Sequence, residues 1–153
     1  MNDTLKRISD KLIAFHREKY DESISPMKLQ KLCYYAQGFY IALNNKKELF
    51  PNDFQAWQHG PVIKELYNEY KSFKWKPIDT DISLEKYENN LDEDNFLHDI
   101  ISYFGSYDGA TLSAMTHKET PWLEARGGIS DIEPSNAIIT KENLYDYFIK
   151  QIA

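Results

Sequence analysis

One short window of the chain gathers residue types that could carry out acid–base chemistry or bind a metal ion. The stretch LSAMTHKETPWLEAR, residues 112–126, contains His117, Glu119, Trp122 and Arg126. Histidine titrates near neutral pH, so His117 could transfer a proton with Glu119 as its partner. His59, in the motif HGP, could add a third group from elsewhere in the chain. Together, His59, His117 and Glu119 define a hydrolase-like hypothesis.

The spacing of these residues argues against that hypothesis. Residues two apart on an α-helix point roughly 200° apart, so His117 and Glu119 cannot hold a metal ion from one helix face. Histidines four residues apart can do so. No nucleophile accompanies them, because Cys33, the one cysteine, falls on the apolar stripe of a predicted helix and is expected to be a buried thiol. We therefore expect a non-enzymatic protein with no catalytic residue and no metal site.

The glycines give no sign of a bound cofactor. The chain has six of them, but it contains neither GxxxxGK followed by Ser or Thr nor GxGxxG, the usual phosphate-binding loops. We expect no cofactor. A weaker alternative is that free backbone N–H groups near Gly60 and Pro61 bind an anion.

Length and composition predict one compact domain. The chain has 153 residues, of which 42% are hydrophobic and 27% charged, which suffices for a real core. A single cysteine excludes an intramolecular disulfide and fits a reducing compartment. No apolar run approaches the roughly 18 residues of a membrane-spanning helix, and the charged start lacks a signal-peptide pattern. We expect a cytoplasmic protein without membrane contact.

Charge is distributed unevenly along the chain. Residues 1–76 carry 13 Lys and Arg against 9 Asp and Glu, whereas residues 77–153 carry 5 against 15. Eight of these carboxylates lie between Asp79 and Asp99. Such a block is either a solvated surface or a face that attracts a basic partner. Nucleic acid is disfavoured as a partner because duplex binding needs clustered Lys and Arg, although the N-terminal half leaves a weaker option open.

The apolar spacing is helical almost throughout and predicts a mainly α fold. Helices are expected around residues 5–15, from Ser25-Pro26 to about Asn44, from Pro61 onward, around 96–104 and 112–115, from Thr120-Pro121 onward, and around 144–152. The segment AIIT, residues 137–140, could be a short strand. We predict a compact single-domain bundle of six or seven helices over residues 1–153, with at most a minor short β element.

Aromatic residues favour an interaction surface over an active site. The chain has 11 Tyr, 8 Phe and 3 Trp, and helical spacing places Tyr34, Tyr35, Tyr67 and Tyr70 at the edges of apolar faces. Tyrosine and tryptophan are frequent anchors of protein interfaces. Tyrosines also occur at core boundaries, where the ring is buried and the hydroxyl contacts solvent.

Two long motifs resemble a known family. Residues 25–70, SPMKLQKLCYYAQGFYIALNNKKELFPNDFQAWQHGPVIKELYNEY, resemble the first motif block of the Panacea antitoxin domain family, which includes SocA-like and phage-associated GepA-like proteins. The stretch LSAMTHKETPWLEAR resembles its second block, and the similarity spans about residues 5–150. The resemblance marks twelve candidate binding residues: Lys28, Tyr34, Tyr35, Trp57, His59, Gly60, Pro61, Tyr67, His117, Glu119, Trp122 and Arg126.

The resemblance implies a small, mainly helical antitoxin of a two-gene toxin–antitoxin pair. Such a protein neutralises a cognate toxin, encoded by a neighbouring gene, through direct binding. The SocA-like branch implies an alternative, an adaptor that delivers its toxin to an ATP-dependent protease. Phage-associated members imply another, the binding of a host factor. The chain has no room for the DNA-binding module that some members add, so direct nucleic-acid binding is not expected.

The opening window then has a structural interpretation. We expect residues 116–126 to form a corner between two helices in which Pro121 starts the second helix and Trp122 anchors the core. Arg126 or His117 is expected to pair with Glu119. This corner would hold the segment AWQHGPV, residues 56–62, in place.

Overall fold

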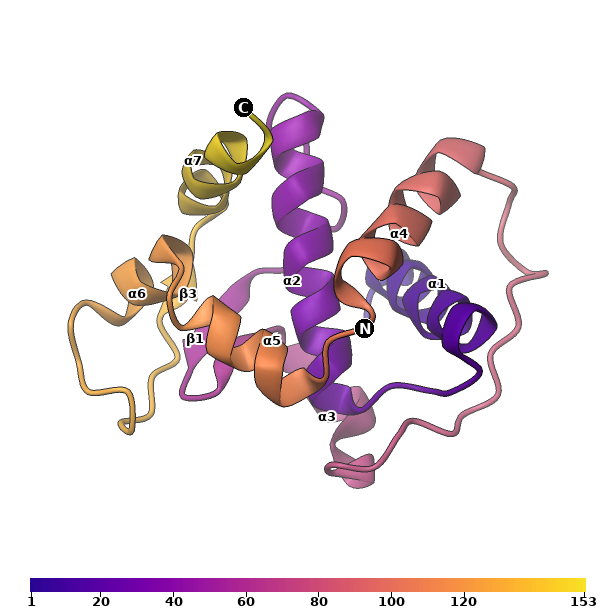
Figure 1. Cartoon of the computed structure of the whole chain (residues 1–153), viewed down its shortest axis with the longest axis horizontal. Coiled ribbons are helices and arrows are strands. Elements are labelled where there is room, and N and C mark those ends of the chain that lie inside the picture. Colours follow the sequence, from indigo (N-terminus) through magenta and orange to yellow (C-terminus); the bar gives the residue numbers. More distant parts are fainter.

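The computed structural model describes all 153 residues and confirms the predicted mainly α fold. Its seven α-helices are accompanied by one 3-10 helix and a small sheet (Figure 1). The helices are α1 (Asp3–Tyr20), α2 (Pro26–Leu43), α3 (Lys64–Tyr70), α4 (Leu91–Phe104), α5 (Gly109–Thr116), α6 (Thr120–Arg126) and α7 (Lys141–Ile152), and the 3-10 helix η1 is Lys71–Phe73. The strands are β1 (Phe54–Trp57), β2 (Gly60–Val62) and β3 (Ile138–Ile139). No helix is both long and apolar enough to cross a membrane.

Helix α2 is the centre of the molecule. Every residue from Lys28 to Gly38 is buried, because α1, α4, α5 and α7 pack around it (Figure 1). A helix that is covered on all sides cannot show the one-sided apolar stripe of a surface helix. Its start was predicted correctly: the Ser25 side chain accepts a hydrogen bond from the N–H of Lys28, and Pro26 occupies the first turn. Cys33 is buried there, as predicted, and burial raises the pKa of its thiol.

The small sheet has the order β2-β1-β3, with β1 antiparallel to both neighbours. Strand β3 lies within the segment AIIT, where a short strand was considered, and Ile139 pairs with Phe54 of β1. The prediction of a helix opening at Pro61 was wrong, because residues 60–62 form β2 and α3 begins at Lys64.

A side chain from α2 explains this difference. Gln30 accepts a hydrogen bond of 2.8 Å from the N–H of Ile63 and donates one of 3.0 Å to the carbonyl of the same residue. This pair holds Ile63 in an extended conformation, with φ −89° and ψ 118°, and delays the helix until Lys64. Gln37, one heptad later on α2, holds the N–H of Leu49 and the carbonyl of Phe50 in the same way. Two buried amides thus fix both flanks of β1 and β2.

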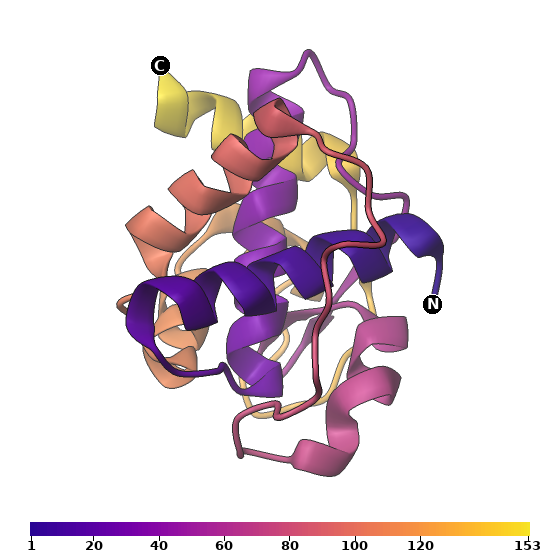
Figure 2. The same ribbon diagram turned by 90° about the vertical axis from the view of Figure 1, so that its right-hand side faces the viewer.

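The acidic segment consists of two structurally different parts. Residues 79–90 form an extended strap that crosses α1 (Figure 2), and most of its side chains are exposed. At its start, the N–H of Ile78 donates to the carbonyl of Ile24, while the Arg17 guanidinium donates to the carbonyl of Ile78. Near its end, the Tyr87 hydroxyl donates to Asp10 at 2.6 Å.

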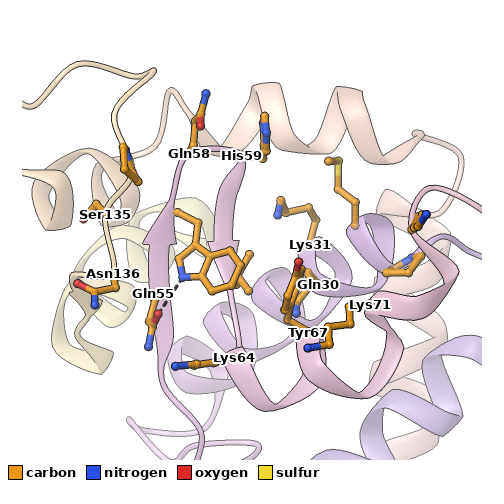
Figure 3. Close-up of a pocket in the computed structure, with 16 residues that line it drawn as sticks. Gln30, Lys31, Gln55, Gln58, His59, Lys64, Tyr67, Lys71, Ser135 and Asn136 are labelled. Atoms are coloured by element: carbon orange, nitrogen blue, oxygen red, sulfur yellow. Dashed lines mark hydrogen bonds between the residues drawn. The ribbon is translucent and has the colours of Figure 1, made fainter.

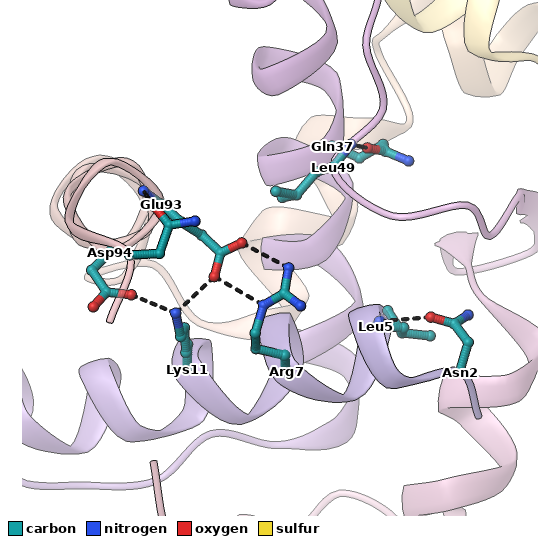
Figure 4. Close-up of polar contacts among 9 residues, drawn as sticks. Asn2, Leu5, Arg7, Lys11, Gln37, Leu49, Glu93 and Asp94 are labelled. Carbon is teal, nitrogen blue, oxygen red and sulfur yellow. Dashed lines mark hydrogen bonds and ion pairs between the residues drawn. The ribbon is translucent and has the colours of Figure 1, made fainter. Parts of the chain in front are cut away.

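The second part of the acidic segment opens α4 and pairs with the basic N-terminal helix. The Glu93 carboxylate accepts hydrogen bonds from Arg7 and, at 2.7 Å, from Lys11, and Asp94 lies 2.6 Å from the same lysine ammonium (Figure 4). Burial opposes ionisation of Glu93, but the hydrogen bonds from Arg7 and Lys11 outweigh it and hold the pKa below its ordinary value. Part of the charge asymmetry is therefore neutralised inside the fold.

Candidate functional site

The corner between α5 and α6 forms as predicted in its outline. Pro121 lies in the first turn of α6, and Trp122 is only 1% exposed. Helix α6 begins one residue earlier than the predicted cap-then-proline pattern, because Thr120 is already helical and Glu119 occupies the N-cap position. The Glu119 side chain does not cap the helix, which leaves its carboxylate free for another partner.

That partner is a pair of tyrosines on α2, so the predicted pairing of Glu119 with Arg126 or His117 was wrong. Glu119 accepts hydrogen bonds of 2.9 Å from the Tyr34 hydroxyl and 2.8 Å from the Tyr35 hydroxyl. Both tyrosines are buried and not at the exposed edges expected from their spacing. Burial raises the pKa of Glu119, although hydrogen bonds from the tyrosines act in the opposite direction. The buried hydroxyls need an acceptor, and only the folded corner brings one.

Trp122 joins the corner to the first strand. Its ring stacks on His117 with 4.2 Å between centroids, and the Arg126 guanidinium lies 4.8 Å from the ring centroid. The Trp122 indole N–H donates to the carbonyl of Trp57, and Arg126 donates to the carbonyl of Ala56 at 3.0 Å. Burial also lowers the pKa of His117, so its imidazole is mainly neutral at pH 7. The corner therefore holds β1 in place, as predicted.

Arg126 also fixes the loop that follows α6. Its second terminal nitrogen donates to the carbonyls of Ser130, at 2.7 Å, and Glu133. Five guanidinium N–H groups in a rigid plane suit such multiple backbone contacts. This places residues 134–136 beside the β1–β2 hairpin, where they form one wall of a groove (Figure 3).

The β1–β2 hairpin is held from its other side by α2 and α5. Ser113 of α5 donates to the carbonyl of His59, and the Lys31 ammonium donates to the carbonyl of Pro61 at 3.1 Å. Gly60 has φ +112°, and a Cβ built there would lie 2.7 Å from the Thr116 hydroxyl. Only glycine suits both this backbone conformation and this close approach. The hairpin is thus clamped between three helices.

A basic groove of about 840 Å³ lies next to the hairpin. Its walls come from the first turns of α2, the hairpin, α3 with η1, and residues 134–136. Figure 3 shows Gln58 and His59 on one side and Lys64 and Lys71 on the other. The groove also contains Lys31, Lys74, Trp57 and Tyr67, and no Asp or Glu is among its 16 lining residues. We name it the lysine groove.

The most buried cation of the lysine groove is Lys31. Its side chain is 1% exposed, and burial lowers the pKa of its ammonium to about 7. Lys31 was not among the residues predicted from the sequence to form a site. Its neighbours in the sequence include Lys28 and Gln30, so no local pattern marked Lys31 as buried. A fully buried lysine needs a structural or a ligand-binding reason.

Residues 29–123 match the family model described as antitoxin SocA-like, Panacea domain. The chain belongs to the SocA-like Panacea domain family. The matched segment runs from the first turn of α2 to the first turn of α6, and so includes the hairpin, the corner as far as Leu123 and most of the lysine groove. Searches of curated proteins and of solved structures found no match.

Most of the Panacea motif residues are buried in the fold, His117 is half-buried against Trp122, and three residues line the lysine groove. Tyr34, Tyr35, Glu119, Trp122 and Arg126 are buried parts of the scaffold. Gly60 and Pro61 are buried in β2, and Lys28 is buried elsewhere, where its ammonium contacts the carbonyl of Gly105 and the imidazole of His16. Trp57, His59 and Tyr67 line the lysine groove.

The hydrolase-like group of His59, His117 and Glu119 does not converge in this Panacea domain. No hydrogen bond joins any two of them. Both carboxylate oxygens of Glu119 accept from tyrosines, His117 is stacked on Trp122, and His59 is exposed. The geometry therefore gives acid–base chemistry at these residues no support.

Proposed function

We propose that this Panacea protein is a non-enzymatic antitoxin that neutralises a cognate protein toxin by direct binding. The observation that carries the proposal is the family match over residues 29–123, which includes most of the central helix and most of both motif blocks. We further propose that residues 1–153 act as one Panacea-like domain in the cytoplasm. The toxin would be encoded by a neighbouring gene.

The arrangement of motif residues supports binding as the function. Glu119, Trp122 and Arg126 use their polar groups to fix backbone or tyrosines inside the fold, which makes the corner a rigid support. The segment it supports presents His59 and the half-buried Trp57 to the surface, next to Tyr67, which is 42% exposed. Exposed aromatic side chains on a rigid support are the usual anchors of a protein interface.

The extended strap is a second candidate contact for a toxin. Asp79, Asp81, Glu85 and Glu88 are exposed on residues 79–90 and take no part in the ion pairs of Arg7 and Lys11. A row of exposed carboxylates speeds association with a basic protein through long-range attraction. We propose that this strap steers a basic toxin toward the domain.

The test is co-expression of the adjacent gene with this chain, followed by a growth assay and an affinity pull-down. Rescue of growth with a stable complex is the expected result. Rescue with disappearance of the toxin, dependent on an active ATP-dependent protease, would favour the adaptor alternative. An adjacent gene that is neither toxic nor bound would contradict the antitoxin proposal and direct the search to host factors.

A variant of the strap sharpens this test. Replacing Asp79, Asp81, Glu85 and Glu88 by Asn or Gln should slow complex formation and weaken its dependence on salt, without changing the fold. A matched control replaces Asp3, Glu18, Glu69 and Glu124, which are exposed acids on other surfaces. Equal effects of the two sets would show that net charge, and not the strap, governs association.

A further inference from the structure

The lysine groove differs from the rest of the surface in its charge. The chain carries 24 Asp and Glu against 18 Lys and Arg, yet the groove has four lysines and one histidine and no carboxylate among 16 lining residues. Solvated surfaces of acidic proteins usually mix both signs of charge. A concave site with only positive groups attracts an anion and raises its local concentration.

Lys31, the most buried lysine of the groove, has no carboxylate of the protein as a counter-ion. Lys11, which is buried to a similar degree, has two carboxylates, Glu93 and Asp94, within 2.7 Å of its ammonium. Lys31 has no carboxylate partner, and its one hydrogen bond goes to the backbone carbonyl of Pro61. Without a counter-charge, burial favours the neutral amine of Lys31. An anion in the groove would stabilise the ammonium form and supply further acceptors.

Aromatic and amide groups occupy the same cavity. Trp57 and Tyr67 meet edge to face, with 5.0 Å between ring centroids, on the wall formed by β1 and α3. Gln58 and Asn136 extend from the rim (Figure 3). Cavities of this size accommodate small organic ligands, with apolar and aromatic walls for the body and a few polar groups for orientation. Aromatic side chains are also the usual stacking surfaces for nucleobases.

We propose that the lysine groove binds a nucleotide carrying two or more phosphates. The phosphates contact Lys31 and the lysines of α3 and η1, and the base lies against Trp57 and Tyr67. A long nucleic acid fits less well, because the acidic residues outside the groove repel a polyanion that continues beyond it. An acidic peptide that extends beyond the groove meets the same repulsion from the acidic residues outside it. Trp57 and Tyr67 are also the aromatic side chains proposed above to contact the toxin, so a nucleotide and a toxin would share this wall, although toxin binding does not require the nucleotide.

The test is isothermal titration calorimetry of the purified full-length protein at low ionic strength. The probes are ATP, GTP, ADP, tripolyphosphate, a six-nucleotide RNA and a glutamate-rich hexapeptide. Binding of at least one nucleotide, more tightly than tripolyphosphate by roughly tenfold, is expected because the base adds stacking to the phosphate contacts. No heat with any nucleotide would overturn the proposal. Equal or tighter binding of tripolyphosphate, RNA or peptide would overturn the nucleotide assignment.

Substitutions test the assigned residues. Lys31→Met fills a similar volume and should reduce nucleotide affinity by about tenfold or more, because it removes a charged donor. The double variant Lys71→Gln with Lys74→Gln changes exposed side chains only and keeps the test valid if Lys31→Met fails to fold. Lys46→Gln with Lys47→Gln, exposed lysines outside the groove, is the matched control and should bind as the wild type does. Equal affinity of the groove and control variants would overturn the site.

Discussion

The Glu119 carboxylate accepts a 2.8 Å hydrogen bond from the Tyr35 hydroxyl, and this contact joins the α5–α6 corner to the central helix. The two residues are 84 positions apart in sequence and are both buried. Tyr34 donates to the other oxygen of the same carboxylate, so one acidic side chain satisfies two buried hydroxyls. A motif residue that resembles a catalytic acid therefore serves as a structural acceptor.

Removing this acceptor should destabilise the fold. Glu119→Ala leaves two buried tyrosine hydroxyls without a partner, and each unsatisfied group costs about 1–3 kcal/mol. We expect a loss of about 2–4 kcal/mol in the free energy of unfolding, measured by urea denaturation. Glu124→Ala, within the helix that Glu119 precedes, is the control, since Glu124 is exposed and should change stability by less than about 0.5 kcal/mol. A Glu119→Ala protein as stable as this control would contradict the acceptor role.

Ionisation of Glu119 should contribute to the pH dependence of the protein's stability. Because burial raises its pKa in the folded state, the folded protein binds the proton more tightly than the unfolded chain does. This residue therefore makes the protein less stable as pH rises from the unfolded pKa, about 4.3, through the folded value. A Glu119→Gln variant should lack this pH-dependent loss of stability. Denaturation of the wild type and the variant at each pH between 4 and 8 measures the difference. Parallel pH profiles for the two proteins would refute this contribution of Glu119.

Glu93 should contribute to the pH dependence of stability with the opposite sign to Glu119. Arg7 and Lys11 hold the pKa of Glu93 below its ordinary value, so its contribution is present above the unfolded pKa and is lost as pH falls through the folded pKa. Glu93→Gln should cost about 3 kcal/mol near pH 7, because it weakens the pairing of the buried Lys11 ammonium. The difference from the wild type should shrink below about pH 4. Asp99→Asn, an exposed change on the same helix, should show no such trend.

Trp122 should be a major contributor to stability. Its ring is 1% exposed, and it contacts His117, Arg126 and the carbonyl of Trp57. Trp122→Ala should lower the free energy of unfolding by about 3–5 kcal/mol. Leu123→Ala, next to it but 43% exposed, should cost much less. Thermal melting gives a direct comparison, and unchanged melting of the Trp122 variant would disprove the anchoring role.

Two glycines with positive φ provide a matched pair for the hairpin. At Gly60, a Cβ would lie 2.7 Å from the Thr116 hydroxyl and 2.8 Å from Lys31, whereas at Gly128 it would meet nothing within 4 Å. Gly60→Ala should therefore cost more than the roughly 1 kcal/mol of backbone strain expected for Gly128→Ala. It should also displace Lys31 and weaken the binding of any ligand in the lysine groove. Equal stabilities of the two variants would show that the hairpin tolerates a side chain at position 60.

Much of the secondary structure could be predicted because its causes are local. Ser25 and Pro26 start α2 through a hydrogen bond that spans three residues, and apolar residues three and four apart show which segments are helical. The same local logic placed Pro121 in the first turn of α6 and Trp122 in the core. The two motif blocks also indicated the family, which the match over residues 29–123 confirms.

The chemistry of the site depended on contacts that no local pattern contains. Gln30 holds Ile63 extended from 33 positions away, and the packing of α5 against α2 brings Glu119 to the tyrosines. Lys31 could be read as an ordinary surface lysine until α5 and the hairpin covered it beside other cations. Helix boundaries follow from neighbours along the chain, but hydrogen-bond partners and shared cavities follow from which surfaces pack together, and this is decided only when the whole core forms.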